Sequence, residues 1–168
     1  MISGGLDSML AAKALIEQGL HVEGLAFFTG FCTNALKVVS GRELNPMVNN
    51  HNAFWVADQL GIKLNVKDIH EEYKDILLNP KHGYGANLNP CLDCKISMVS
   101  HAHQWIQENG FDFIATGEVV GQRPKSQRKH ALPVINRESG AGDLVLRPLS
   151  AKLLPETIPE KEGWVDRE

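Results

Sequence analysis

The amino-acid sequence predicts an α/β fold in which helices cover both faces of a parallel sheet. Short apolar runs rich in β-branched and aromatic residues alternate with longer segments whose apolar residues recur at helical spacing. A glycine-rich loop separates the first apolar residues from the first helical segment. Because strands that alternate with helices pair in parallel, we expect ligands to bind at the carboxyl ends of the strands.

The first thirty residues contain the beginning of this alternation. The sequence predicts, in order, a short apolar strand at Met1 and Ile2, a turn over residues 3–8, a helix over residues 9–18 and a strand over residues 22–28. Within the helix, Leu10, Ala14 and Leu15 are expected on one face, and Gly19 is expected to end it.

The alternation continues through the middle of the chain. The expected elements are a helix over 52–60, a strand over 64–69, a helix over 70–78, a loop over 79–90, a helix over 92–109 and a strand over 113–116. Glycines end the first and last of these helices. Met47 and Trp55 are expected in the core.

The segment after residue 120 has a different pattern. Residues 1–120 are predicted to form the α/β domain, and residues 121–168 a basic, proline-containing extension of it. Strand-like runs are expected only at 131–135 and 144–146. A central parallel strand usually needs about five residues, and Met1 and Ile2 alone precede the glycine loop. We therefore expect a chain truncated at both ends, with a C-terminal region to follow.

Composition limits the class of protein. The 168 residues carry a net charge of −3, so the surface as a whole does not have the basic character of a nucleic-acid binder, and any RNA contact requires a local patch. No apolar stretch approaches the ~18 residues that span a bilayer. Three cysteines, two of them as Cys91-Leu92-Asp93-Cys94, suit a reducing compartment. These observations indicate a cytoplasmic protein without a membrane anchor.

The strongest functional signal is the loop Ser3-Gly4-Gly5-Leu6-Asp7-Ser8. Glycines let the backbone turn tightly and point its N–H groups at phosphate oxygens beside the positive end of a helix. The loop has no lysine and lacks the Walker spacing, which disfavours transfer of a γ-phosphate. The alternative interpretation is a structural turn between strand and helix, capped by serine or aspartate.

This loop resembles the SGGxDS signature of the PP-loop ATP pyrophosphatase superfamily, whose fold is Rossmann-like (adenine nucleotide alpha hydrolase-like). The resemblance implies that ATP is cleaved at its α-phosphate, that Asp7 orients Mg²⁺, and that the backbone near Phe28 and Gly117 frames the adenosine. It also implies that five loop residues take part in binding the nucleotide: Ser3, Gly4, Gly5, Asp7 and Ser8. Amide-forming synthetases share similar loops, so an adenylating ligase that ends with an amine is the first alternative.

The second signal is the cysteine pair at the start of the long helix. Cys91 and Cys94 lie one turn apart, where the helix dipole favours thiolates. Such a pair can ligate part of an iron–sulfur cluster or zinc, or act as a redox or persulfide couple. For zinc, His82, His101 or His103 could supply a further ligand. Two partly buried cysteines without a ligand are the structural alternative.

Residues 62–117 resemble the tRNA 2-thiouridine synthetase family in the order of their motifs. These are Leu-Gly-Ile-x-Leu, Glu-Glu-Tyr, Asn-Pro-x-x-x-Cys and Asp-Phe-Ile-Ala-Thr-Gly. The sequence has Cys91 where those enzymes have aspartate, and Glu118 where they have histidine. The resemblance implies ATP-dependent thiolation of a tRNA uridine, with sulfur supplied by a donor protein or by sulfide. Asp7, Cys91 and Cys94 are the implied catalytic residues.

The Cys-x-x-Cys spacing also resembles cluster-dependent thiolases, in which three cysteines hold a [4Fe–4S] cluster. That resemblance implies metal ligation by Cys91 and Cys94, with Cys32 or a cysteine beyond residue 168 as the third ligand. Cys32 follows a predicted strand, at the edge of the sheet where ligands gather. The alternatives are zinc at this site, and an ordinary loop position for Cys32.

A local basic stretch follows the last predicted strand of the α/β domain. Arg123, Lys125 and Arg128 lie within six residues of one another, directly after a strand end. Positive side chains in such a loop contact RNA or pyrophosphate, although a solvated surface run has the same composition. The remaining alternative for the whole chain is a nucleotide-binding fragment without complete activity.

Overall fold

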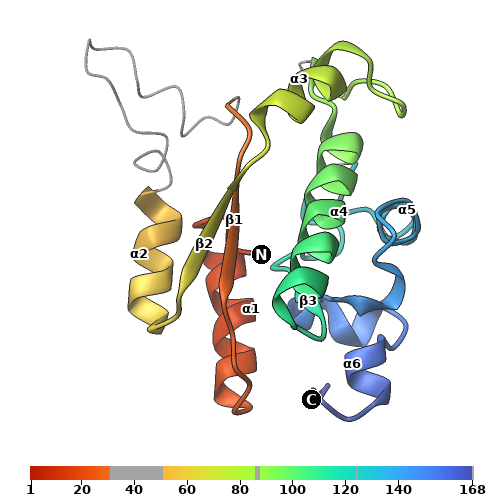
Figure 1. Cartoon of the computed structure of the whole chain (residues 1–168). Helices are drawn as coiled ribbons and strands as arrows, with labels where there is room; N and C mark the ends of the chain where they lie inside the picture. The colour runs from red at the N-terminus through yellow and green to blue at the C-terminus, as the bar shows by residue number, and fades with distance from the viewer. Residues whose placement is uncertain (31–50, 86–87, 124, 168) are drawn as a thin grey trace.

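The computed structural model describes residues 1–30, 51–85, 88–123 and 125–167. Helices and strands alternate along the chain (Figure 1). The principal elements are α1 (Leu6–Glu17), β1 (Gly24–Phe28), α2 (His51–Leu60), β2 (Leu64–Asp68), α3 (His70–Leu78), α4 (Cys91–Asn109), β3 (Ile114–Ala115), α5 (Ala131–Glu138), β4 (Val145–Leu146) and α6 (Ile158–Lys161). Two 3-10 helices, η4 (Gly142–Leu144) and η5 (Pro148–Leu153), flank β4. The predicted order of strands and helices from residue 9 to residue 116 is confirmed, whereas Met1 and Ile2 are not part of an assigned strand.

Strand pairing is parallel throughout the described chain. Strand β1 pairs with β2 from Gly24↔Leu64 to Phe28↔Asp68, and β3 pairs with β4. The first two residues connect these pairs, because Ile2 N donates to Leu25 O at 2.8 Å and Met1 N donates to Ala115 O at 2.6 Å. The strands thus form two two-stranded parallel sheets, β1-β2 and β3-β4, and residues 1–2 bridge them into the order β2, β1, residues 1–2, β3 and β4. This arrangement confirms the predicted parallel α/β fold.

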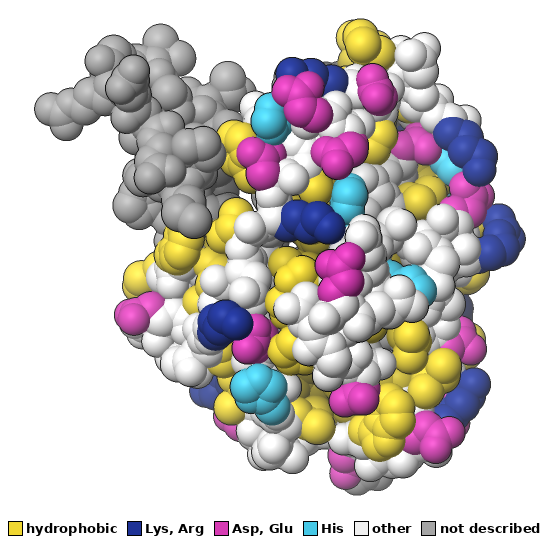
Figure 2. All heavy atoms as spheres, in the orientation of Figure 1, with side chains coloured by type: hydrophobic (Ala, Val, Ile, Leu, Met, Phe, Trp, Pro, Cys, Tyr) yellow, Lys and Arg dark blue, Asp and Glu magenta, His cyan; other side chains and the backbone are white. Residues whose placement is uncertain are grey.

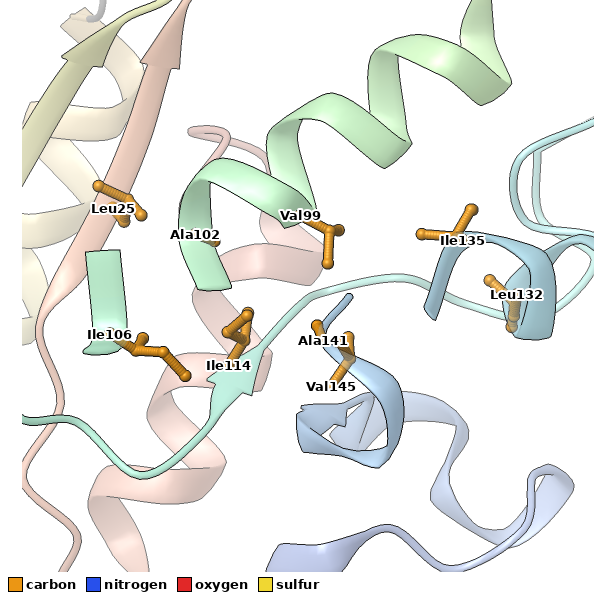
Figure 3. Close-up of a cluster of buried hydrophobic side chains, with 9 residues drawn as sticks. All are labelled: Leu25, Val99, Ala102, Ile106, Ile114, Leu132, Ile135, Ala141 and Val145. Atoms are coloured by element: carbon orange, nitrogen blue, oxygen red, sulfur yellow. The ribbon is translucent and has the colours of Figure 1, made fainter. Parts of the chain in front are cut away.

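The two faces of this sheet carry separate apolar layers. Leu25 and Ala26 are adjacent in β1, so their side chains point to opposite faces. Leu25 joins a core that α4 and α5 supply, and Figure 3 shows these side chains gathered between the two helices and β3. Ala26 joins a second core, with residues from α1 and α2. Helices therefore cover both faces, as predicted.

One predicted element after residue 120 is wrong. Residues 131–135, expected as a strand, begin α5. Ala131, Leu132 and Ile135 are buried together, which is the spacing of one helix face rather than of a strand. Pro133 lies in the first turn of α5, where a missing N–H costs no intrahelical hydrogen bond. The predicted strand at 144–146 is present as β4.

Two expectations about side-chain burial are also wrong. Leu10 is 43% exposed, and the buried face of α1 consists of Ser8, Ala11, Ala12 and Leu15. Three of these four side chains are small, so α1 packs close to its neighbours through short side chains rather than through large ones. Trp55 is 58% exposed on α2. Met47 lies outside the described residues.

The visible surface mixes positive and negative side chains without a large field of one sign (Figure 2). This distribution matches the small net charge of −3. None of the helices in the described ranges is both long enough and apolar enough to cross a bilayer.

Candidate functional site

The glycine loop turns from residues 1–2 into α1 under its own hydrogen bonds. Gly4 has φ +82°, a conformation that strains any residue with a side chain. The Ser8 hydroxyl donates to Gly5 O at 2.8 Å and lies 3.2 Å from Ser3 Oγ, so the two serines clamp the turn. Gly5 is the N-cap and makes no side-chain cap. The first N–H groups of α1 are therefore left for another acceptor.

Two neighbouring segments press directly on this loop. A Cβ atom on Gly117 would lie 2.5 Å from the Asp7 carbonyl carbon and closer still to Ser8 N. A Cβ atom on Gly4 would lie 2.5 Å from Asn52 Cβ, at the start of α2. These contacts place the segment after β3, and the first turn of α2, against the loop. Gly117 and the glycine loop therefore share the carboxyl edge of the sheet, as the parallel fold requires.

A cavity opens at this edge of the sheet. Residues from the loop, from the ends of β1 and β3, from α4 and from the basic segment line it: Ser3, Gly5, Asp7, Ser8, Phe28, Thr29, Gly30, Lys95, Met98, Thr116, Gly117, Glu118, Arg123 and Gln127. Apolar residues 1, 2, 25 and 27 complete the lining. The cavity combines backbone donors, two cations, two carboxylates and two aromatic rings. The donors, cations and rings suit an anionic nucleotide.

The structure brings together most of the residues singled out from the sequence. Seven of them line the cavity: Ser3, Gly5, Asp7, Ser8, Phe28, Gly117 and Arg123. Gly4 supports the turn from behind through its contact with α2. Cys32 lies outside the described residues. Lys125 points elsewhere, since its Nζ donates to Tyr84 O at 2.6 Å, and Arg128 is an exposed residue beyond the cavity lining.

Cys91 and Cys94 occupy the first turn of α4 as partly buried, reduced thiols. Neither thiol is among the described residues that line the loop's cavity. Lys95 and Met98 of α4 do line it. The spacing of residues 91, 94, 95 and 98 puts all four on one helical stripe. The thiols therefore continue the cavity wall by about one helical turn.

The segment before α4 is tied to the cysteine turn by a histidine. His82 N donates to Asp93 Oδ2 at 3.0 Å, and His82 Nδ1 lies 2.8 Å from Asp93 Oδ1. On the other side of the ring, Nε2 lies 3.4 Å from Glu138 Oε1 of α5. Both ring nitrogens thus face carboxylates, and the interaction fixes the residue between the two cysteines.

The donor set for a metal is incomplete over the ranges that the structure describes. No group of three or more His, Cys, Asp or Glu side chains is arranged there to hold an ion. His82, one of the histidines considered as a zinc ligand, faces Asp93 and Glu138 through its ring nitrogens. Two thiols alone do not make the three- or four-ligand set of a cluster or zinc site. The described residues therefore do not fit either group.

A buried ionic network forms part of the cavity wall and continues behind it, and it was missed by sequence reasoning. Glu118 and Arg147 are each 3% exposed, and Arg147 Nε donates to Glu118 Oε2 at 2.9 Å. Lys95 Nζ lies 3.5 Å from Glu118 Oε1, and Thr116 Oγ1 donates to Glu118 Oε2 at 3.1 Å. Arg147 is held in turn by Asn136 Oδ1 at 2.9 Å. Cations from two distant segments thus share one buried carboxylate.

The charge state of this carboxylate follows from its neighbours. Burial alone would raise the pKa of Glu118, but the charges of Lys95 and Arg147 and the hydrogen bonds from Arg147 and Thr116 outweigh it. The pKa of Glu118 is therefore lowered, and the group is ionised at neutral pH. The only sequence signal for this network was a charged residue directly after a buried strand.

Gln127 is another polar residue of the cavity lining that was not among the predicted site residues. It is 8% exposed, and its Oε1 makes no hydrogen bond within the described part of the protein. Its backbone carbonyl accepts from Gly121 N at 2.8 Å and closes the turn that carries Arg123 into the cavity.

Comparison with known proteins gives a consistent match. Residues 1–154 match the sequence model of a family described as tRNA methyl transferase HUP domain. Proteins named tRNA-specific 2-thiouridylase MnmA are similar: one from Treponema denticola is 37% identical over 121 residues, covering 69% of this chain and 31% of that protein. Another, from Corynebacterium kroppenstedtii, is 33% identical over 176 residues, covering 96% of this chain and 46% of that protein. The chain thus spans less than half the length of these curated relatives.

Proposed function

Because the chain belongs to the tRNA methyl transferase HUP domain family, we propose that it supplies the ATP-binding and cysteine-bearing part of an enzyme that replaces a uridine oxygen of tRNA by sulfur. The similar proteins are named for thiolation at the 2-position, and we assign the same target atom here. The activity is proposed for a whole protein of the relatives' length, because this chain spans less than half of the relatives.

One observation carries the proposal: the glycine loop and a cysteine-bearing helix contribute to a single wall. Ser3 and Ser8 line the cavity on one side, and Lys95 lines it from α4, directly after Cys94. A nucleotide held by the loop would therefore lie beside the helix that carries the thiols. Sulfur transfer needs this neighbourhood, since the activated carbon and the sulfur must meet within about 3–3.5 Å.

The first step activates the base. The uridine O2 atom attacks the α-phosphorus of ATP, the bond to the bridging oxygen breaks, and pyrophosphate leaves while the N3 proton is released. The unsatisfied N–H groups at the start of α1, with the hydroxyls of Ser3 and Ser8, stabilise the charge that builds on pyrophosphate. Asp7, in the first turn of α1, orients the Mg²⁺ that accompanies ATP. Phe28 and Gly117 frame the adenosine.

The second step delivers sulfur. A sulfur donor, either a persulfide-bearing protein or sulfide with an oxidant, first leaves a persulfide on Cys94. Its terminal sulfur attacks C2 and expels AMP, which leaves the base joined to Cys94 through a disulfide. Cys91 thiolate then attacks Cys94 Sγ, the S–S bond to the base breaks, and N3 regains a proton. The product is 2-thiouridine with a Cys91–Cys94 disulfide, which a thiol reductant reopens.

The proposed steps use the two cysteines without a bound metal. A [4Fe–4S] cluster would supply an open iron for hydrosulfide, and zinc would hold thiolates, but the described donors complete neither site. The cysteines act here as a dithiol. Iron and sulfide analysis of the anaerobically purified full-length protein tests this choice directly.

The RNA is held by the basic segment. Arg123 lines the cavity, and Arg128 is exposed on the same turn-rich segment. Both can contact phosphates of tRNA beside the activated base. We place the reaction in the cytoplasm, where ATP and tRNA are available and thiols stay reduced.

The test follows the fate of ATP in the full-length protein. Wild type should release pyrophosphate and form AMP only when uridine-containing tRNA is present, whereas Asp7→Ala and Gly5→Val should release none. Lys13→Met is the matched control, because Lys13 is an exposed residue of α1. Formation of ADP and phosphate, or normal pyrophosphate release by both loop variants, would refute the proposed chemistry.

A further inference from the structure

The glycine loop has no lysine, yet a lysine reaches its cavity from another element. Lys95 of α4 lines the cavity with Ser3, Asp7 and Ser8, although it lies almost ninety positions later in the chain. Its side chain is about three-quarters buried, at 24% exposure. A lysine seldom loses this much solvent contact unless its charge has a partner.

The ionic network does not neutralise this lysine. Glu118 carries one negative charge, and both Lys95 and Arg147 lie against it. Arg147 has the shorter contact, 2.9 Å from its Nε to Oε2, against 3.5 Å from Lys95 Nζ to Oε1. Arg147 is 3% exposed and does not line the cavity, whereas Lys95 does. The three groups together carry one excess positive charge. Lys95 brings it to the cavity, which the carboxylates of Glu118 and Asp7 also line.

We propose that Lys95 binds the α-phosphate of the nucleotide and that Glu118 positions it there. This inference rests on the proposed function. The glycine loop grips the pyrophosphate end, while Lys95 follows Cys94 directly, so the lysine lies on the side from which sulfur approaches. The phosphate that remains on the activated base through both steps is the α-phosphate, and a cation beside it stabilises the leaving pyrophosphate first and the leaving AMP second.

Glu118 is a positioning residue rather than a catalytic one. Arg147 and Thr116 fix its Oε2, and Asn136 fixes Arg147, so Oε1 is presented to Lys95 from a rigid base. Arg147 offsets the carboxylate, which leaves the ammonium charge of Lys95 for the ligand. A lone glutamate at this position would bind the lysine and cancel it. Because Arg147 balances the charge of Glu118, Lys95 can bind an anion instead of being neutralised by the carboxylate.

The experiment compares Lys95→Met, Lys95→Arg and Glu118→Gln with wild type in the full-length protein. Pyrophosphate release is measured over a range of ATP concentrations up to saturation, and AMP release is measured separately from preformed adenylated tRNA. Lys95→Met should slow both steps by about a hundredfold, as loss of one oxyanion donor does. Lys95→Arg should recover most of each rate because it keeps the charge. Glu118→Gln should lower kcat more than it raises KM for ATP, since the lysine stays charged but is no longer held.

Controls separate this role from a structural one. Lys13→Met removes an exposed lysine of α1 and should match wild type in both steps. Thermal unfolding of each variant shows whether it folds, and rates are expressed per folded molecule. A lysine with only a structural role would lower the unfolding temperature in Lys95→Met without changing the rate per folded molecule, and that result would overturn the inference.

Failure of the proposed function gives a different pattern. If wild type releases no pyrophosphate with tRNA, the thiolation scheme fails, and ATP binding measured by equilibrium dialysis then decides the role of Lys95. Weaker ATP binding by about tenfold in Lys95→Met, restored in Lys95→Arg, supports the phosphate contact on its own. Equal ATP affinity in wild type and Lys95→Met overturns it.

Discussion

The substitution Gly117→Ala tests whether the close contact between Gly117 and the first turn of α1 positions the glycine loop. The new Cβ atom would lie 2.5 Å from the Asp7 carbonyl carbon, and it would also strike Ser8 N. Ordinary contacts of this kind need about 3.4–4 Å, so one backbone must retreat by roughly 1 Å. Both obstacles are backbone atoms of α1, so no side-chain rotation can relieve the contact. The first turn of α1 must move as a unit.

Two effects of different size follow from this displacement. Overpacking of a tight contact costs about 1–3 kcal/mol of unfolding free energy. A shift of about 1 Å in the donors that hold the phosphates costs about a hundredfold in rate. We therefore expect Gly117→Ala to fold with a lowered melting temperature and to lose nearly all pyrophosphate release, while ATP binding weakens measurably in equilibrium dialysis.

Gly61→Ala is the matched control. Gly61 has φ +64° and open space around its Cβ position, so alanine there costs about 1–2 kcal/mol from the backbone conformation alone. Its stability should fall about as far as that of Gly117→Ala, but its ATP affinity and pyrophosphate release should match wild type. Wild-type ATP affinity and activity in Gly117→Ala would refute the reasoning, because the contact between Gly117 and α1 would then not position the loop.

Three further predictions concern the parts around the cavity. Asp93→Ala removes both hydrogen bonds with His82 and should lower the free energy of unfolding by about 1–3 kcal/mol in denaturant titration. It should also lower the rate of sulfur transfer more than the rate of pyrophosphate release. Glu108→Ala, at the exposed end of α4, should change neither the unfolding free energy nor these rates. The lowered pKa of Glu118 means that its carboxylate stabilises the fold fully above its ordinary pKa of 4.5 and loses that contribution as pH falls through the lower folded value. Glu118→Gln should therefore be less stable than wild type at neutral pH and show a shallower loss on acidification in thermal unfolding; parallel curves would contradict this. Arg128→Ala should weaken tRNA binding and reduce its salt slope by about 1, with Lys74→Ala on α3 as control; an unchanged slope would exclude a phosphate contact.

Local patterns in the sequence predicted most of the fold because the relevant signals are short in range. The helix at 70–78 has the predicted bounds, and the other predicted helices before residue 110 differ by a few residues at their ends. Alternation of strands and helices implied parallel pairing, which placed Gly117 beside the glycine loop. Leu10 was misjudged because hydrophobicity predicts a large buried side chain, whereas α1 packs through Ala11 and Ala12.

The parts that could not be predicted depend on contacts between distant residues. Glu118 and Arg147 are separated by 29 positions, and no local pattern links them. No local pattern in the sequence placed Lys95 beside the glycine loop, whereas the packing of α4 brings it into the cavity lining. The run at 131–135 was expected as a strand, but it forms the first turn of a helix, where Pro133 is tolerated. The cysteines were predicted at the correct end of the helix. Their position along α4 relative to the cavity depends on how that helix packs, which the sequence does not show.

The central claim is that adenylation and sulfur transfer are separate steps, the first at the glycine loop and the second at the cysteine turn. Thiolation of a uridine-containing tRNA and pyrophosphate release should be measured together for full-length wild type, Cys91→Ser and Cys94→Ser. The account predicts that both variants lose sulfur transfer yet still release pyrophosphate, up to about one equivalent per tRNA. Full thiolation by both variants would contradict it.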